Sequence, residues 1–128
     1  MYAPNPSHRN GNNRKSQWII PQTQEIDCFS KAESNGWLYQ HEGWGLHCPN
    51  GAPVFLGRLA RSHKETFIAK FVNSRSTRQQ ALWHGYPADH QNNAQDIPET
   101  EILKKWLMLN LLKAAKIRKI IKGQPCSL

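Results

Sequence analysis

The stretch WHGYPADH, residues 83–90, brings two imidazoles, a phenol and a carboxylate close together in the sequence. His84 can take up or release a proton near neutral pH, which suits a general acid or base. Tyr86 and the preceding Lys70 could stabilise the negative charge of a phosphate. His84, Tyr86 and Lys70 are therefore the candidate catalytic residues, and together they suit the metal-independent cleavage of nucleic acid by a small nuclease-like toxin. The alternative is that His84 is a hydrogen-bonded structural residue that holds a turn.

A metal site in the same region is disfavoured by the spacing of its donors. His84 and His90 are separated by five residues that include a proline, which matches no standard pair of zinc ligands. His47 and Cys48 would have to be brought to them by the fold. The chain also lacks a glycine-rich phosphate loop and a Gly-x-Ser-x-Gly elbow. We therefore predict neither a bound metal nor a cofactor.

Basic side chains dominate the charge of the chain. Seventeen Lys and Arg stand against nine Asp and Glu, a formal net charge of +8, which attracts polyanions. One basic group belongs to a predicted hairpin and the segment after it: Arg58, Arg61, Lys64, Arg75 and Arg78. A second group lies in residues 104–122, which include no acid: Lys113, Lys116, Arg118, Lys119 and Lys122. Both groups are candidate binding residues, although a basic stretch near a helix end is also common as a solvated face.

This charge pattern predicts a small non-enzymatic binding protein that engages an acidic partner, either nucleic acid or an acidic protein. Accessory proteins of defence, prophage or immunity systems are the kind of protein that we expect. Two alternatives stay open: the nuclease-like toxin that uses His84, and a structural or assembly subunit that buries apolar side chains of residues 106–121 between chains. Charge does not distinguish the two acidic partners, and the sequence does not give the oligomeric state.

The aromatic residues before the hairpin have two interpretations. Trp37, Tyr39 and Trp44, interleaved with basic side chains, could form a stacking surface for single-stranded nucleic acid. Alternatively, all five tryptophans are buried, as large aromatics in small domains usually are. We favour burial.

An α+β fold must position these residues: an antiparallel β-meander of about four strands, with a short N-terminal helix and two C-terminal helices packed on one face. Apolar spacing predicts the first helix over residues 23–34. Aromatic and β-branched residues predict the strands, at 37–40, 44–47, 54–60 and 66–72.

The sequence DIPE, residues 96–99, has the form of a capping box, with Asp96 as the cap and Glu99 three residues on. It predicts an amphipathic helix to about residue 110, and a second helix then runs to about residue 123. The apolar stripe of the first of these helices needs a partner surface. We expect it to cover the sheet face that carries Phe67, Ala69 and Phe71.

Residues 1–16 are polar, rich in Asn and Pro, and include three basic side chains. Such a segment buries too little apolar surface to offset its chain entropy. We therefore expect a disordered basic arm at 1–16 and a single α+β domain at 17–128. No apolar run has the roughly 18–20 residues that cross a bilayer, the start of the chain has no signal-peptide pattern, and three widely spaced cysteines favour reduced thiols. These features predict a cytoplasmic protein with no membrane partner.

Overall fold

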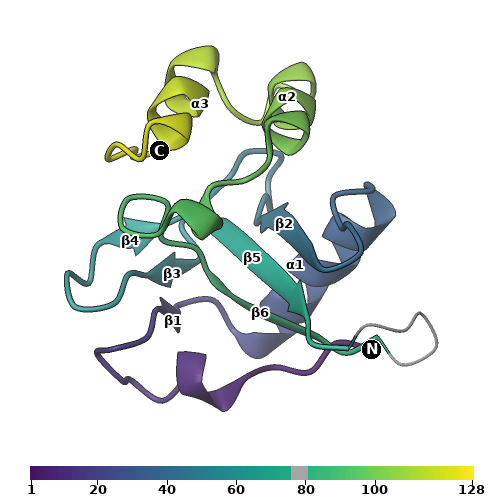
Figure 1. Cartoon of the computed structure of the whole chain (residues 1–128), viewed down its shortest axis with the longest axis vertical. Helices are drawn as coiled ribbons and strands as arrows, with labels where there is room; N and C mark the ends of the chain where they lie inside the picture. Colours follow the sequence, from purple (N-terminus) through teal and green to yellow (C-terminus); the bar gives the residue numbers. More distant parts are fainter. Residues whose placement is uncertain (76–80) are drawn as a thin grey trace.

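The computed structural model describes residues 1–75 and 81–128, and its centre is an antiparallel sheet of three strands. The strands of this central sheet, in spatial order, are β2 (Glu42–Leu46), β5 (Ile68–Asn73) and β6 (Trp83–Pro87). A small second sheet contains, in spatial order, β1 (Gln17–Trp18), β3 (Gly57–Arg58) and β4 (Glu65–Thr66). The predicted α+β class is confirmed. The predicted single meander of about four strands is wrong, because the described residues form six strands in two sheets (Figure 1).

The expected hairpin of residues 54–60 and 66–72 is divided between the two sheets. β4 pairs with β3, whereas β5 pairs with β2 on one side and with β6 on the other. Phe67 lies between β4 and β5, so the chain changes sheet at this residue. Gly57 permits the close approach of the two sheets, because a Cβ atom on it would lie 2.3 Å from the Cγ atom of Pro87.

The hairpin expected from residues 37–40 and 44–47 is shorter than predicted. Its first strand is reduced to one bridge, between Leu38 and Gly43. The backbone N–H of Tyr39 donates to the carbonyl of Glu42 at 2.8 Å, so the chain already turns there. Little length therefore remains for a paired strand before β2.

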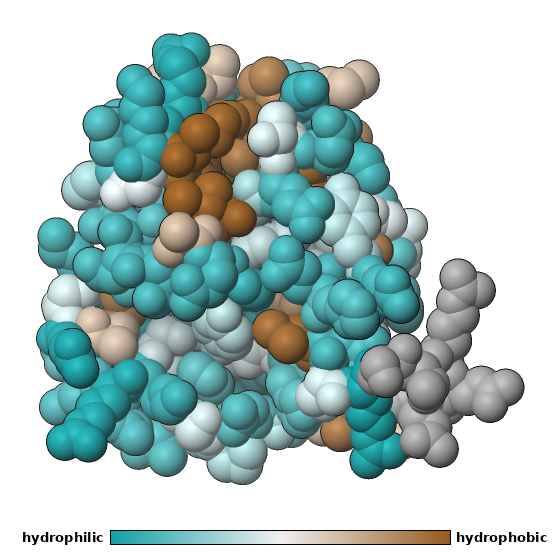
Figure 2. Space-filling model, in the orientation of Figure 1, coloured by the Kyte–Doolittle hydropathy of each residue, from teal (hydrophilic) through white to brown (hydrophobic). Residues whose placement is uncertain are grey.

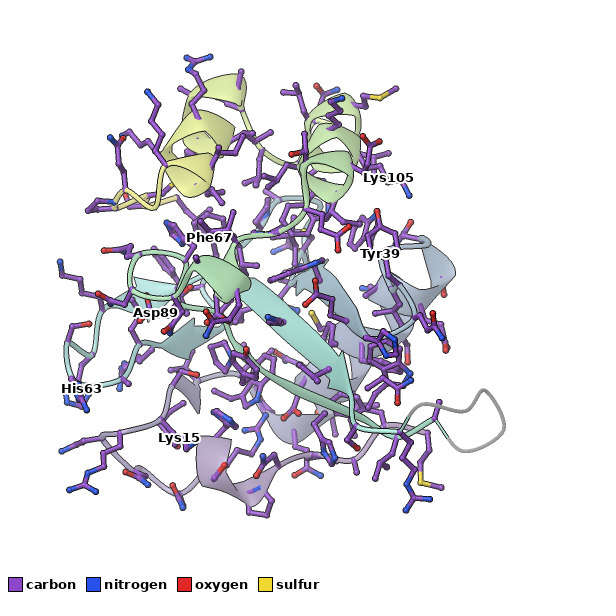
Figure 3. All side chains as sticks on the ribbon, in the orientation of Figure 1. Lys15, Tyr39, His63, Phe67, Asp89 and Lys105 are labelled. Atoms are coloured by element: carbon purple, nitrogen blue, oxygen red, sulfur yellow. The ribbon has the colours of Figure 1, made fainter. Side chains whose placement is uncertain are left out.

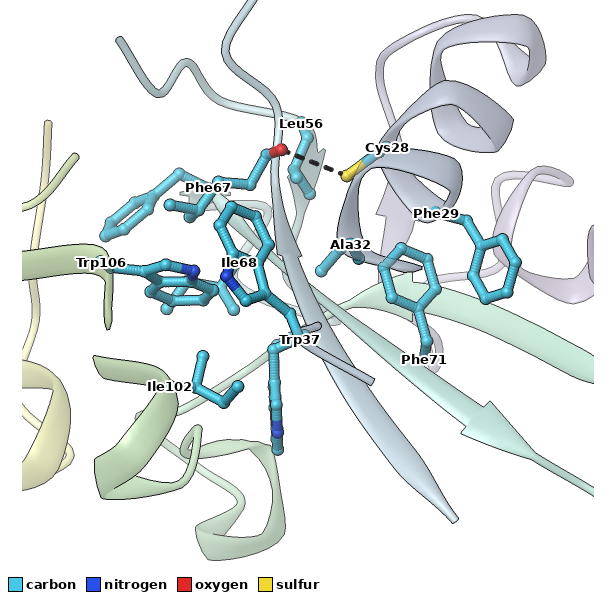
Figure 4. Close-up of a cluster of buried hydrophobic side chains, with 14 of the residues drawn as sticks. Cys28, Phe29, Ala32, Trp37, Leu56, Phe67, Ile68, Phe71, Ile102 and Trp106 are labelled. Carbon is cyan, nitrogen blue, oxygen red and sulfur yellow. Dashed lines mark hydrogen bonds between the residues drawn. The ribbon is translucent and has the colours of Figure 1, made fainter. Parts of the chain in front are cut away.

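One face of the central sheet is covered by α1 (Gln22–Ser34), close to the predicted helix. The Phe29 ring packs edge-on against Phe71 of β5, with 5.3 Å between ring centroids. The Sγ of Cys28 donates a 3.4 Å hydrogen bond to the carbonyl of Leu46 in β2. Figure 4 shows the side chains of this helix on one side of the central strands and Ile102 on the other.

The opposite face is met by α2 (Thr100–Met108), and α3 (Ala114–Ile121) lies beside α2 at one end of the molecule (Figure 1). The Trp106 ring packs edge-on against the Trp37 ring, with 5.8 Å between ring centroids. The expectation that α2 covers the Phe71 face is wrong. Alternate residues of β5 point to opposite faces, so Phe71 meets α1 and Ile68 meets α2 (Figure 4). A membrane crossing would need a longer and more apolar helix than any in residues 1–75 and 81–128.

The predicted capping box does not form. Asp96 is buried at the end of the short helix η3 (Ala94–Asp96), where its carboxylate accepts hydrogen bonds from Tyr86 and from the backbone N–H of Asp89. The N-cap of α2 is Glu99, which makes no side-chain capping bond. The carboxylate that the local sequence would assign to the helix end is therefore used by tertiary contacts.

Residues 1–16 lie against the rest of the chain, contrary to the expected disordered arm. Trp83 donates its backbone N–H to the carbonyl of Met1, and Ala3 donates to the carbonyl of Trp83, so the segment adds a parallel bridge to the edge of β6. The partly buried ring of Tyr2 packs against Phe29 and Phe71 of the core, and the helix η1 (Pro6–His8) ends in a buried histidine. The packing of these two rings anchors the segment, and the mean composition of residues 1–16 does not reveal it.

Candidate functional site

Lys70 lies in the middle of the central sheet, and its side chain is 6% exposed. The ammonium donates to the backbone carbonyl of Gln95 and lies 3.5 Å from a carboxylate oxygen of Glu42 and 3.8 Å from one of Asp96. It also stands 5.1 Å from the centre of the Trp44 ring. The positive charge predicted to stabilise a phosphate is therefore neutralised inside the protein.

Tyr86 is paired with Lys70 across the β5–β6 register. Its hydroxyl donates a 2.8 Å hydrogen bond to Oδ1 of Asp96. Burial, with the charge of Asp96, raises the pKa of Tyr86 well above its ordinary value of 10.0. The phenol is thus a protonated donor held by a carboxylate.

His84 pairs with Val72 in the same register, so it shares a sheet face with Tyr86 and Lys70. Its Nδ1 lies 2.9 Å from the backbone carbonyl of Ala3. The sheet therefore brings the three candidate catalytic residues to one face. Each of them, however, bonds to another part of the protein, and their use in cleavage remains a prediction.

His8 is the residue of this face that sequence reasoning missed. Its ring stacks on Tyr86 with 5.2 Å between centroids and 17° between planes, and its Nδ1 lies 2.8 Å from the carbonyl of Ser16. Burial lowers the pKa of His8 below its ordinary value of 6.5, so the ring is neutral at pH 7. Nothing in the polar segment 1–16 indicated that this histidine, unlike its neighbours, would be buried.

The N-terminal segment also contributes cations. The backbone N–H of Arg61 donates to the carbonyl of Asn13 at 2.8 Å, which joins the β3–β4 loop to residues 13–15. Arg14 and Lys15 therefore lie next to the hairpin's basic residues. They line a hollow of about 330 Å3 that also contains His8. Figure 3 shows Lys15 and His63, the latter in the β3–β4 loop, on the same flank of the molecule.

The two basic groups predicted from the sequence meet at a second hollow. Lys64 of the β3–β4 loop and Lys119 of α3 both line this hollow of about 370 Å3, together with the acid Glu65. Two further predicted residues of the C-terminal group, Lys113 and Lys116, line a third hollow of about 570 Å3 next to α2 and α3.

The remaining predicted binding residues are more scattered. Arg58, Arg118 and Lys122 are exposed. Arg75 follows β5 by two residues, and the end of β5 lies on the opposite side of the molecule from the β3–β4 loop (Figure 1). Arg78 lies outside the described residues. The first hairpin group is therefore not one continuous surface.

The tryptophans take no part in a binding surface. All five are at most 7% exposed, and only Tyr39 of the proposed stacking residues is partly accessible. The favoured interpretation, burial in the core, is confirmed.

The cysteines and the possible metal ligands form no further site in the described part of the chain. Cys28, Cys48 and Cys126 are free thiols, and burial raises the pKa of Cys28 to about 12, so it is no nucleophile. Among residues 1–75 and 81–128, no three His, Cys, Asp or Glu side chains are grouped so that they could hold a metal ion.

Comparison of the chain with protein-family models, with curated proteins and with solved structures finds no match. The function must therefore be argued from the geometry and charge of the described residues.

Proposed function

We propose that this protein is a non-enzymatic binding protein that holds nucleic acid along one basic flank. The flank consists of six cations from three parts of the chain: Arg14, Lys15, Arg58, Arg61, Lys64 and Lys119. The observation that carries the proposal is the shared hollow of Lys64 and Lys119, which makes the hairpin and the C-terminal helix one surface. Within the described part of the chain, none of the six cations forms an ion pair with a protein carboxylate, so their charges are available to a partner.

The polar character of this flank favours nucleic acid over an acidic protein. Stable protein interfaces usually have an apolar centre with a polar rim. The flank is largely hydrophilic in Figure 2, and apolar surface gathers instead at the end that carries α2 and α3. There the exposed apolar side chains include Leu107, Met108, Leu109 and Ile121. A row of cations without an apolar centre suits phosphates, which contribute affinity mainly by counterion release.

The test is the salt dependence of binding to labelled single-stranded RNA, single-stranded DNA and duplex DNA, measured by fluorescence anisotropy. We expect the protein to bind nucleic acid with an affinity that falls as the salt concentration increases. The double substitution Lys64→Ala/Lys119→Ala removes up to two phosphate contacts, so the slope of log affinity against log salt should fall by roughly 1–2.

A matched control removes two cations from elsewhere. Lys31 lies 3.1 Å from Asp27 in α1, and Lys104 lies 3.7 Å from Glu101 in α2. Lys31→Ala/Lys104→Ala lowers the net charge by the same amount and should leave the slope unchanged. Equal loss in both double variants, or retention that ignores salt, would contradict the proposed flank. The same samples, held in EDTA, are scored for cleavage, and cleavage that His84→Ala abolishes would favour the nuclease alternative.

A further inference from the structure

The hollow of about 330 Å3 beside η1 has an unusual inner wall. His8 lines it and is 9% exposed. A backbone carbonyl can only accept, so the 2.8 Å contact with Ser16 places the hydrogen of the neutral ring on Nδ1. Nε2 is then an acceptor, and no described residue donates to it. Nε2 is not sealed from solvent, so from the wall of the hollow it can accept a hydrogen bond from a ligand.

Two buried carboxylates extend this acceptor surface. Asp96 and Asp89 are 3% and 8% exposed and line the same hollow. Asp89 accepts two hydrogen bonds, both from Asn92, at 3.1 Å and 2.9 Å. A carboxylate has about four lone-pair positions, so Asp89 retains capacity for a further donor. The inner wall therefore offers acceptors, whereas the exposed Arg14 and Lys15 offer positive charge at the rim.

We propose that this hollow binds a nucleotide whose base has its amino group at C4 of a pyrimidine or C6 of a purine, that is cytosine or adenine, with the amino group toward Nε2 of His8 and Asp89 and the phosphate at Arg14 and Lys15. This inference rests on the proposed function, since the basic flank begins at the same two cations. The amino groups at cytosine N4 and adenine N6 donate hydrogen bonds that a carboxylate can accept. Uracil, thymine and guanine present a carbonyl oxygen at the corresponding position, which would face the protein's acceptors.

The size and the aromatic lining agree with such a ligand. Ligand sites commonly have volumes of about 300–1,000 Å3, and the rings of His8 and Tyr86 form part of this wall. Recognition of a base by its hydrogen-bonding edge beside aromatic side chains is typical of single-stranded nucleic acid. The ligand can be a free nucleotide or a nucleotide within a single strand, and the experiment separates these two sources.

The first experiment titrates the unmodified protein with CMP, AMP, UMP and inorganic phosphate, followed by NMR. We expect CMP and AMP to bind at least about tenfold more tightly than UMP and phosphate. The Nε2 resonance of His8 should shift, whereas that of His41, exposed before β2, should not. Equal affinity for UMP, equal affinity for phosphate, no binding, or shifts confined to other residues would each overturn the proposal.

Variants then locate the contacts. Arg14→Ala/Lys15→Ala, both at exposed positions, should weaken CMP binding by about tenfold or more, while the matched Lys31→Ala/Lys104→Ala does not. His8→Phe keeps an aromatic ring over Tyr86 but removes Nε2, and should abolish the preference for CMP over UMP. Loss of binding in the matched control as well as in the Arg14/Lys15 variant, or a CMP preference that survives in folded His8→Phe, would overturn the site.

Oligonucleotides of equal length separate the ligand sources and the two proposals. Oligo(dC) bound more tightly than oligo(dT), with CMP bound as expected, supports a base inserted from a strand. CMP preference without oligo(dC) preference assigns the hollow to free nucleotides. Both oligonucleotides could bind in a salt-dependent way with no base preference, and the mononucleotides could show none either. That result would overturn the proposed nucleotide site in the hollow and leave the proposed basic flank standing. Absence of all nucleic-acid binding overturns the flank.

Discussion

Glu25 and Asp96 are buried carboxylates on opposite faces of the central sheet, and the two are held by the same kinds of group. On the α1 face, Glu25 accepts hydrogen bonds from the hydroxyl of Tyr2 and from Nε of Arg9, the latter at 2.9 Å, and its Oε1 lies 2.8 Å from Nη2 of Arg9. On the other face, Asp96 accepts from the hydroxyl of Tyr86 and lies 3.8 Å from the ammonium of Lys70. Each carboxylate thus has a tyrosine and a cation.

The two networks differ in what surrounds them. Glu25 is fully buried, and its partners Tyr2 and Arg9 both come from residues 1–16, so this network closes the N-terminal segment onto α1. Asp96 borders the hollow that contains Asp89 and His8. The closed network stabilises the fold, because the Tyr2 hydroxyl and the Arg9 guanidinium both bind the buried carboxylate of Glu25. The open network leaves acceptors for something else, which is why we place the candidate site there.

The largest expected effect comes from breaking the closed network. Glu25→Ala leaves Arg9 without its counter-ion and Tyr2 without its acceptor. Removal of one partner of a buried pair costs about 3–5 kcal/mol, and the 22% exposure of Arg9 places this case near the lower value. We expect the free energy of unfolding, measured by urea denaturation, to fall by about 3 kcal/mol.

Glu33→Ala, at an exposed position of the same helix, is the control and should change stability by no more than about 0.5 kcal/mol. Similar losses in the two variants would contradict the role assigned to Glu25.

A smaller effect compares the two tyrosines directly. Tyr2→Phe removes a donor from a carboxylate that is closed to water and should destabilise by about 1–3 kcal/mol. Tyr86→Phe removes the same group from Asp96, which retains Lys70 and the backbone N–H of Asp89 and borders a hollow where water can replace the hydroxyl. Its cost should be about 0.5–1.5 kcal/mol. A larger loss for Tyr86→Phe than for Tyr2→Phe would reverse the comparison.

The smallest effect is the pH dependence that His8 adds to stability. Its pKa is lowered in the folded protein from 6.5, so the unfolded chain binds a proton at higher pH than the folded one. The free energy of unfolding must then decrease as pH falls below about 6.5, until the folded-state pKa is passed. His47, whose pKa is also lowered by burial, acts in the same direction. The difference between the native protein and His8→Phe isolates His8.

We therefore expect urea denaturation between pH 7.5 and pH 5 to show a weaker pH dependence in His8→Phe than in the native protein. Parallel curves would mean that His8 is not buried as a neutral ring.

Much of the fold could be predicted because its signals are local. The period of apolar residues predicts α1 to within about one residue, and β-branched and aromatic residues mark most of β5, which begins two residues and ends one residue later than predicted. The failures involve residues whose local preference lost to a distant contact. Asp96 stands where the sequence predicts a helix cap, but its carboxylate accepts hydrogen bonds from the hydroxyl of Tyr86 and the backbone N–H of Asp89. Phe67 lies inside a continuous strand pattern, yet the chain changes sheet there because pairing partners come from elsewhere.

The candidate site could be predicted only in part. The sequence predicts no strand at residues 83–87, and only β6 of the structure places His84 and Tyr86 on one face with Lys70. The sequence does not reveal that Lys70 is neutralised by Glu42 and Asp96, which lie far from it along the chain. His8, Arg14 and Lys15 were assigned to a disordered arm, because composition averages over a segment and hides a single buried ring.

The sequence by itself determined the positive charge, the α+β class and the residue types available for chemistry, since these depend on composition and short-range periodicity. Only the tertiary structure decided which charges are neutralised and which are free. The hydroxyl of Tyr2 and the guanidinium of Arg9 bind the first 16 residues to Glu25, and the β3–β4 loop joins them to Arg61. The physical reason is that a buried carboxylate must find its donors wherever the chain can supply them, at any distance in sequence.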